Sequence, residues 1–592
     1  MMTITTNIFL LVTSFTHRCN IILLPLFVSF CSWQCSPDKT AANTVFHNAK
    51  VITVDSVFSI HEAVAIRDGK FISVGTNEEV MTHAGEATTV IDLGGHAVIP
   101  GLIEGHAHPI AASQSEYHDT IPVVETIEDV LKWIKSEAGE KDDGEWIIHP
   151  KFFITRMSNM RQITIAELDA AAPRNPVFLN GSYGGIVNTR ALELSEMTRV
   201  MHPGILTDKQ TGRPSGLIRR SAFSLLALPP PDTLSAEEKS KALKDLLHLY
   251  NSIGFTSVCS GGGPVEELKV FESLRASDEL TVRIFHNIRL RLDLTRSQAE
   301  LTEDIKKLGL KTGDGDAWVK TGAFKVTLDG GMLTGTAFLH EGWGAKARDL
   351  YGINDPDYRG ELMLSRRELI KIISAADEAG WKFTAHVTGG GGVDTLLAAY
   401  QAVNHLQPIG EKRFSIIHGN FFTSGAIEKM AAMGVYADMQ PAWFYKDTDL
   451  IHHVLGSERI KTFHPYRSLM RAGVIVNAGS DHMVKMDPDL AINPYNPFTA
   501  MWSVVTRKTT RGTVFNPEEA ISRAEALKMY TINNAMASFE EKIKGSIEIG
   551  KLADLVIISD DILTCPEDAI RDIKPILTMV NGKTVFSRGV LK

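Results

Sequence analysis

Two histidines separated by one alanine, His106 and His108, are the first residues in the chain whose types and spacing suit a metal ion. In a β-strand, residues i and i+2 point to the same side, so both imidazoles can face one ion. Neutral imidazole is a good ligand for zinc and similar divalent cations. One such pair is weak evidence in a chain of 592 residues with 20 histidines, so further ligands are needed.

Further polar residues end later strand-like runs. Lys325 lies in "WVKTGAFKVTLDG", His386 in "KFTAHVTGG", His418 in "FSIIHGN" and Asp481 in "GVIVNAGSD". His386 and His418 are placed to hold a second ion. Nearby cations lower the pKa of a lysine, and the neutral amine of Lys325 can then take up carbon dioxide to form a bridging carbamate. Asp481 can both coordinate a metal and accept a proton from bound water.

Simpler roles remain open for the same residues. The histidines are also explained as ordinary surface or buried residues, and Asp481 as a helix N-cap. Lys325 is also explained by an ion pair with Asp329, and Lys320 is a rival for its role. His482 is expected to point away from the site because it follows Asp481 directly. Four other histidines are not expected to be direct ligands: His340, His452, His453 and His464.

The elements that must position these residues are eight apolar, strand-like runs separated by amphipathic helices. The runs are "VIPGLIEGH", "GFTSVCSGG", "VRIFHNIRL", "WVKTGAFKVTLDG", "KFTAHVTGG", "FSIIHGN", "GVYADMQP" and "GVIVNAGSD". Eight β/α units predict an α/β fold with a closed parallel (β/α)8 barrel of the TIM type, over residues 100–540. Chemistry in such barrels lies at the carboxyl ends of the strands, where all six residues are expected to converge.

Three further regions surround the predicted barrel. Residues 45–99 and 541–592 contain short β-branched strands with Asp-Gly, Gly-Gly and Asn-Gly turns, which predicts one small β-sandwich formed by both ends of the chain. Residues from about 118 to 245 separate the first and second barrel strands and carry β and α signals of their own. We interpret them as an inserted subdomain beside the barrel mouth.

The beginning of the chain resembles an export signal. The apolar run "IILLPLFVSF" follows Arg18 and is too short to span a bilayer, so residues 1–35 are interpreted as a signal or lipoprotein leader and residues 36–44 as a linker. A lipid anchor at Cys31 or Cys35 is one alternative within this reading. A leader of either kind predicts an exported protein, periplasmic or envelope-anchored in a bacterium, with no transmembrane span after removal of the leader. A mis-started leader would instead predict a cytoplasmic protein.

Composition narrows the class of protein. The chain is 44% hydrophobic and 22% charged, as in ordinary globular proteins. A net charge of −9 and a pI near 6.1 argue against a nucleic-acid partner. Beyond residue 35 only Cys259 and Cys565 remain, which excludes a disulfide framework and a cysteine zinc site. The expected partner is a small-molecule substrate, and a homodimer is left open.

The sequence resembles the amidohydrolase superfamily, most closely its amidohydrolase-3 branch of YtcJ-like and N-substituted formamide deformylase-like proteins. Matching segments include "PGLIEGHAHP", "FKVTLDGG", "AHVTGGGGVD", "SIIHGN", "MQPAWF", "PYRSLMRAG", "NAGSDH" and "GSIEIGKLADLVIIS". The resemblance implies one or two divalent metals, zinc above all, in a (β/α)8 barrel. It implies metal roles for His106, His108, Lys325, His386, His418 and Asp481, with carboxylation of Lys325 as a further option.

Two departures from the family pattern bear on the substrate. The family often has Gly-Asp where this chain has Gly389-Gly390, and a histidine in the insert where this chain reads Ser182-Tyr183-Gly184-Gly185. The first removes a carboxylate near the second metal position, and the second removes a substrate contact.

The function expected from these residues is metal-dependent hydrolysis of a carbon–nitrogen bond other than a peptide bond, in an amide or N-acyl compound. Hydroxide activated by the metal attacks the carbonyl, and Asp481 acts as catalytic proton shuttle. Lactone hydrolysis, phosphoester hydrolysis and deamination by the same site are alternatives, and a non-catalytic envelope binding protein is a third hypothesis. Pocket-lining roles are assigned to Trp343, Trp443, Tyr445 and Arg467.

Overall fold

The computed structural model describes residues 41–230 and 233–589. The predicted leader at 1–35, with its anchoring cysteines Cys31 and Cys35, lies outside the described residues, so export and lipidation stay predictions. The same holds for most of the linker at 36–44, whose last residue, Thr44, already begins the first strand.

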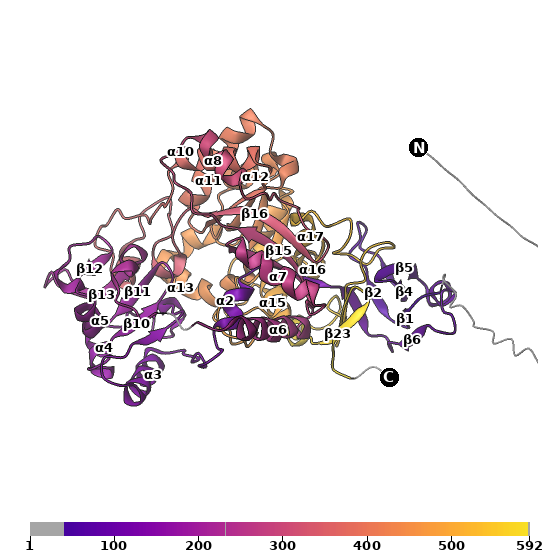
Figure 1. Cartoon of the computed structure of the whole chain (residues 1–592), viewed down its shortest axis with the longest axis horizontal. Helices are drawn as coiled ribbons and strands as arrows, with labels where there is room; N and C mark the ends of the chain where they lie inside the picture. Colours follow the sequence, from indigo (N-terminus) through magenta and orange to yellow (C-terminus); the bar gives the residue numbers. More distant parts are fainter. Residues whose placement is uncertain (1–40, 231–232, 590–592) are drawn as a thin grey trace, which may run out of the picture. The chain divides into compact units, whose positions relative to one another are not determined.

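An eight-stranded parallel sheet contains the predicted active-site strands (Figure 1). Its strands follow one another in chain order, and each pairs in parallel with the next. They are β8 (Leu102–Ala107), β14 (Phe255–Gly263), β15 (Arg283–Ile288), β16 (Val319–Thr327), β17 (Phe383–Val387), β18 (Ser415–His418), β19 (Tyr436–Met439) and β20 (Val476–Ala478). All eight correspond to the predicted runs, and the TIM-like barrel is confirmed.

The backbone beyond the ends of the first and last strands closes the barrel. The amide of Asp481 donates to the carbonyl of His106 over 2.7 Å, and the amide of His108 donates to the carbonyl of His482 over 2.7 Å. Glu104 on β8 adds a side-chain link, since its carboxylate accepts from the amide of Ser480, just beyond β20, at 2.8 Å. The closure therefore brings residues 106–108 next to residue 481, although 375 positions separate them in the chain.

Helices on the outside of the barrel bury their apolar faces against the sheet. α10 (Arg366–Glu378) is an example: Ser365 and Glu368 form a capping box at its start, and Leu369, Ile372 and Ile373 lie on one buried face. The other helices in this part of the chain are α2 (Pro109–Gln114), α6 (Ala236–Ser252), α7 (Glu266–Ala276), α8 (Gln298–Lys306), α9 (Ala345–Tyr351), α11 (Gly390–Leu406), α12 (Ser424–Met433), α13 (Pro441–Arg459), α14 (Tyr466–Arg471), α15 (Pro497–Thr506), α16 (Arg523–Met529) and α17 (Ile532–Ala537).

Two smaller sheets are built from the ends of the described chain. One has four strands, β1 (Thr44–His47), β4 (Ala63–Arg67), β5 (Lys70–Gly75) and β6 (Thr89–Asp92), with helix α1 (Asn77–Met81). The other combines β2 (Lys50–Ile52), β3 (Ile60–His61) and β7 (Ala97–Pro100) with β21 (Leu555–Ile558), β22 (Pro575–Val580) and β23 (Lys583–Ser587). β7 pairs antiparallel with β21, so the two ends share a sheet. A buried ion pair, Arg283 Nε to Asp554 Oδ2 at 2.7 Å, ties this region to barrel strand β15.

The segment between β8 and β14 contains a third sheet of five strands. They are β9 (Ile147–His149), β10 (Val177–Asn180), β11 (Gly184–Val187), β12 (Ile205–Thr207) and β13 (Pro214–Arg219), accompanied by α3 (Ile127–Glu140), α4 (Ile165–Ala171) and α5 (Thr189–Leu194). Its end differs from the predicted boundary near 245. Helix α6 already begins at Ala236, and its Leu243, Leu246 and Leu247 belong to the barrel core because they pack on the outside of the sheet.

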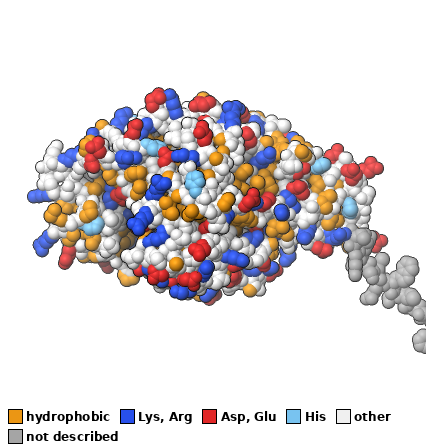
Figure 2. Space-filling view, turned by 90° about the horizontal axis from the view of Figure 1, so that it is seen from above, with side chains coloured by type: hydrophobic (Ala, Val, Ile, Leu, Met, Phe, Trp, Pro, Cys, Tyr) orange, Lys and Arg blue, Asp and Glu red, His pale blue; other side chains and the backbone are white. Residues whose placement is uncertain are grey.

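The surface of the described chain mixes both signs of charge. Figure 2 shows lysine, arginine, aspartate and glutamate side chains interspersed on the face in view. Among the helices of residues 41–230 and 233–589, none has the length and apolar character needed to cross a membrane.

Glu540 provides a test of how buried charges stabilise the barrel. It is buried and contacts Lys320 Nζ at 2.9 Å and Lys544 Nζ at 2.6 Å. Burial alone would raise its pKa, but the two lysines outweigh burial and lower it from 4.5. A lowered pKa in the folded state gives stabilisation that is present above about pH 4.5 and is lost as the pH falls through the lower value.

We therefore expect Glu540→Gln to lower the melting temperature at pH 7, because removing one partner of a buried pair costs about 3–5 kcal/mol. The difference from wild type should narrow as the pH falls below 4.5, because the wild-type protein then progressively loses the stabilisation from this carboxylate. Scanning calorimetry at several pH values measures it, with Lys583→Met in the exposed Lys583–Asp278 pair as control. An equal difference at pH 7 and pH 3 would show that charge is not the cause.

Candidate metal centre

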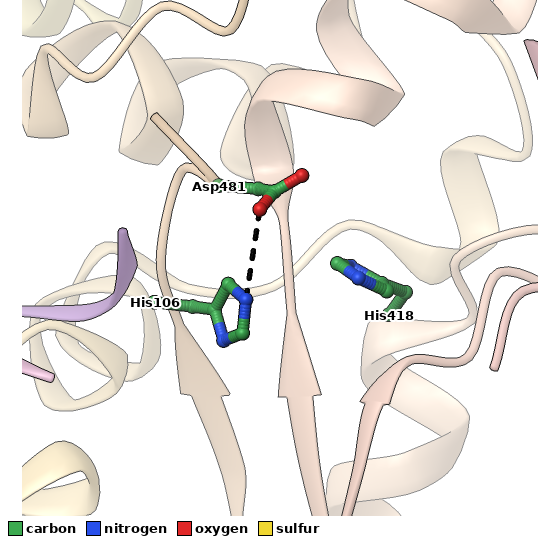
Figure 3. A group of neighbouring side chains, drawn as sticks. All are labelled: His106, His418 and Asp481. Carbon is green, nitrogen blue, oxygen red and sulfur yellow. Dashed lines mark ion pairs between the residues drawn. The ribbon is translucent and has the colours of Figure 1, made fainter. Parts of the chain in front are cut away.

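The six residues predicted to bind metal gather at one end of the barrel. A cavity of about 270 Å³ is lined by His108, Lys325, His386, His418 and Asp481, and fully buried His106 contacts four of these residues. Ligand atoms of His106, His418 and Asp481 all lie within 4.8 Å of one another (Figure 3). Two imidazoles and a carboxylate are the donor set expected for a divalent transition metal.

Asp481 links the two histidines of the first strand. Its Oδ1 lies 3.6 Å from His106 Nε2 and 3.4 Å from His108 Nε2. The Nζ of Lys325 lies 3.2 Å from His106 Nε2. These distances are close enough for one ion or bridging group to be shared with only small side-chain movements.

His386 and His418 form the other half of the site. The centres of their rings lie 4.5 Å apart, and the centre of the His418 ring lies 5.4 Å from that of His106. Gln440 Oε1 lies 2.7 Å from His418 Nδ1, which orients the ring and leaves its Nε2 for a ligand. Trp443 stacks on His418 with 4.4 Å between the ring centres.

Burial sets the protonation of these histidines. The pKa values of His106, His386 and His418 all lie well below 6.5, primarily because the charged form is removed from water. The positive charge of Lys325 lowers each of them further. All three rings are therefore neutral at pH 7, which is the form that binds metal.

Two of the ligating candidates have strained backbones. His418 has a φ of 75° and Asp481 a φ of 58°, in the left-handed region that ordinary residues avoid. Asn493 donates to the carbonyl of Asp481 over 2.7 Å and helps to hold this conformation. Burial alone would raise the pKa of Asp481, but His108, His106 and Lys325 outweigh it, so the carboxyl stays ionised.

Lys325 is buried beside Gly261, a position where a side chain would collide with its neighbours. Burial, followed by the positive charge of Arg289, lowers the pKa of Lys325 to about 8. Its Nζ also donates to the carbonyl of Gly261. A Cβ atom at Gly261 would lie 2.7 Å from His106 Nε2, so only glycine lets β14 approach the site this closely.

The structure supports neither Lys320 as a rival nor an ion pair between Lys325 and Asp329. Lys320 reaches Glu540 instead of the cavity. Asp329 is occupied by the backbone amides of Phe338, Thr388 and Gly389. Lys325 is thus the lysine at the cavity.

Histidines set aside by sequence lie elsewhere. His482 faces Tyr250, whose hydroxyl is 2.9 Å from His482 Nδ1, and stacks on Tyr495. His464 Nε2 lies 2.9 Å from Asn420 Nδ2. The cavity lining does not include them, nor His340, His452 or His453.

Of the four residues predicted to line the pocket, the structure places one there. Trp443 lines the cavity. Trp343 is fully buried in the core beneath the insert, where its indole donates to the Ala337 carbonyl at 3.1 Å. Tyr445 packs against Trp502 and lines a neighbouring cavity, and Arg467 is exposed, with its guanidinium 3.5 Å from the Glu518 carbonyl.

Other cavity residues were not predicted: Lys151, Tyr183, Arg220, Arg289 and Asn493. Arg289 directly follows β15, so the same strand-end pattern that identified the histidines could have identified it as a cavity residue. Lys151 and Arg220 follow β9 and β13 of the insert, whose approach to the barrel no single-sequence pattern indicates. Asp438 on β19 was also missed; its Oδ2 lies 3.7 Å from His106 Nδ1, behind the cavity.

The structure also accounts for both departures from the family pattern. A Cβ at Gly390 would lie 2.6 Å from the ring of His340, which is paired with Asp394 at 2.8 Å. In the insert, the Tyr183 hydroxyl lies 3.5 Å from His386 Nδ1, so a different polar group faces the site.

Comparisons with known proteins agree with this architecture. A family model described as "Amidohydrolase family" matches residues 89–586. N-substituted formamide deformylase of Arthrobacter pascens is 28% identical over 91% of this chain and 98% of its own length. Putative amidohydrolase YtcJ of Bacillus subtilis (strain 168) is 24% identical over 92% and 99%, respectively. A metal-dependent hydrolase of Pyrococcus horikoshii OT3, described as uncharacterised, shares the fold with a TM-score of 0.63, at 20% identity over 89% of this chain and 99% of its own.

Proposed function

The chain belongs to the amidohydrolase family, and from its converging ligands we propose that it hydrolyses the carbon–nitrogen bond of a small amide or N-acyl compound. The family confirms the predicted resemblance and the prediction of a metal-dependent hydrolase. The observation that carries the proposal is that ligand atoms of His106, His418 and Asp481 all lie within 4.8 Å of one another. The similarity to a formamide deformylase favours a formyl or other short acyl group.

The residues present fit one or two divalent ions, and we propose zinc. His106, His108 and Asp481 would hold one ion, and His386 with His418 a second. Lys325, whose amine lies beside His106, would bridge them after adding to carbon dioxide, with a new N–C bond and loss of one proton. A bound ion lowers the pKa of a water molecule from about 15.7 toward about 7 and polarises the substrate carbonyl.

The chain's own side chains direct the proton transfers and the substrate. The ionised Asp481 accepts the proton of the attacking water at its carboxylate and delivers it to the departing amine. The pKa of Tyr183 is raised by burial, so its hydroxyl stays protonated and can donate a hydrogen bond to the substrate oxygen. Trp443, stacked on His418, forms an apolar wall.

A substrate panel tests this function. Protein loaded with zinc should hydrolyse N-formyl and N-acetyl amines much faster than lactones, phosphotriesters or aminopurines of similar size. Release of the amine is measured by chromatography, with protein purified in chelator as control. Turnover of lactones or phosphotriesters without amide cleavage would overturn the proposal.

A further inference from the structure

The cavity wall carries an excess of positive charge. Besides Lys325, its lining includes Lys151, Arg220 and Arg289, whereas Asp481 is the single carboxylate among the described lining residues. Asp481 already contacts His106 and His108. The wall therefore has no protein carboxylate to neutralise its three additional cations.

None of these cations forms an ion pair within residues 41–230 and 233–589. Lys151 donates to the Ser182 hydroxyl, and Arg289 donates to the Thr327 hydroxyl at 2.5 Å. The guanidinium of Arg220 lies 5.3 Å from the centre of the Tyr183 ring. Most of their N–H donors are thus available to a ligand.

Neighbouring arginines of the insert show the contrast. Arg156 forms a close pair with Asp447, its Nε 2.8 Å from Oδ1, and the Arg219 Nε lies 3.9 Å from a Glu361 carboxylate oxygen. These two arginines have carboxylate partners, whereas Lys151 and Arg220, which line the cavity, have none among the described residues.

Tyr183 lies between the positively charged wall and the candidate metal ligands. Its hydroxyl lies 3.5 Å from His386, and Arg220 lies over its ring. Lys151 contacts Ser182, the preceding residue. A substrate group beside Arg220 and Lys151 is therefore about one aromatic ring away from the carbon–nitrogen bond to be cleaved.

We infer that the substrate carries a carboxylate that binds Arg220 and Lys151, with Arg289 adding positive potential nearer to Lys325; this inference rests on the proposed function. Guanidinium groups bind carboxylates through paired, charge-assisted hydrogen bonds, and unpaired cations in a cleft attract anions over longer distances. An N-acylated amino acid unites the two required groups, and its size suits a cavity of about 270 Å³.

Matched probes test the inference. N-formylphenylalanine carries the carboxylate, and N-formylphenylalaninamide is its neutral counterpart; both enantiomers are used. For wild type loaded with zinc, kcat/KM should be at least about tenfold higher for the acid. Equilibrium dialysis with chelator-treated protein should show the same preference without turnover, weakening as sodium chloride is raised.

Variants locate the effect. Arg220→Gln and Lys151→Met should bring the acid-to-amide ratio close to one, chiefly through the KM of the acid, and Arg220→Lys should restore part of it. Arg199→Gln, an exposed change of equal charge in the same insert, should leave the ratio unchanged.

The outcomes separate the two proposals. If amides are cleaved but acid and amide bind alike, or if the ratio survives in both variants, the carboxylate subsite is wrong and the hydrolase function stands. If no amide is cleaved, the proposed function fails, and dialysis with the same probes still decides whether Arg220 and Lys151 bind a carboxylate.

Discussion

Asp481→Asn is expected to lower kcat by about 10³-fold or more while the protein remains folded. General acid–base catalysis contributes about 10²- to 10⁴-fold, and this residue would act in both directions of proton transfer and also contact the metal. Asparagine keeps the shape of the side chain and tolerates the left-handed backbone at this position, whose φ is 58°. The loss should therefore reflect chemistry and not unfolding.

The comparison requires rates and a measure of folding. Steady-state kinetics on an N-formyl substrate gives kcat, and circular dichroism with thermal melting shows whether the fold is kept. Asp278→Asn, at a carboxylate that is 76% exposed, is the matched control and should behave as wild type. Wild-type kcat in Asp481→Asn would refute the role of this carboxylate.

Removing the metal should abolish activity, with a decrease in kcat/KM of about 10³-fold or more. Without the ion, an ordinary water with a pKa of about 15.7 would have to attack the carbonyl at neutral pH. Dialysis against a chelator followed by elemental analysis measures the removal, and stepwise addition of zinc should restore activity at one or two equivalents. Undiminished activity in protein shown to be metal-free would contradict the mechanism.

His106→Ala and His418→Ala test metal binding by removing ligands instead of the ion. Each removes one ligand atom from the cluster and should lower the zinc content per chain. His464→Ala is a suitable control because its buried ring faces Asn420 and Tyr466, away from the cavity. Equal zinc in all three variants would place the ion elsewhere.

The barrel and its ligands could be predicted because the strand ends carry their own signal. His386 and His418 each end an apolar run, and in a parallel barrel all such ends meet at one face. Asp481 was recognised the same way, although its contact with His106 depends on barrel closure, which the order of eight strands implies.

Residues outside the strand ends could not be placed in this way. Lys151 and Arg220 reach the cavity from the inserted sheet, and their position depends on how the insert packs against the loop after β16. Trp343 was predicted to line the pocket, but its indole finds a carbonyl partner in the core. Asp438 was missed because an aspartate inside a buried run gives no sign of whether it faces inward.

The most direct test of the metal centre is X-ray diffraction from crystals of the protein as purified, measured on both sides of the zinc absorption edge. A peak in anomalous difference density is expected between His106, His108 and Asp481, about 2.0–2.3 Å from their ligand atoms. A second peak beside His386 and His418 would show a two-metal site, and extra density on Lys325 Nζ would show the carbamate. Density at this cavity without any anomalous peak, in crystals whose protein is active, would contradict the metal centre.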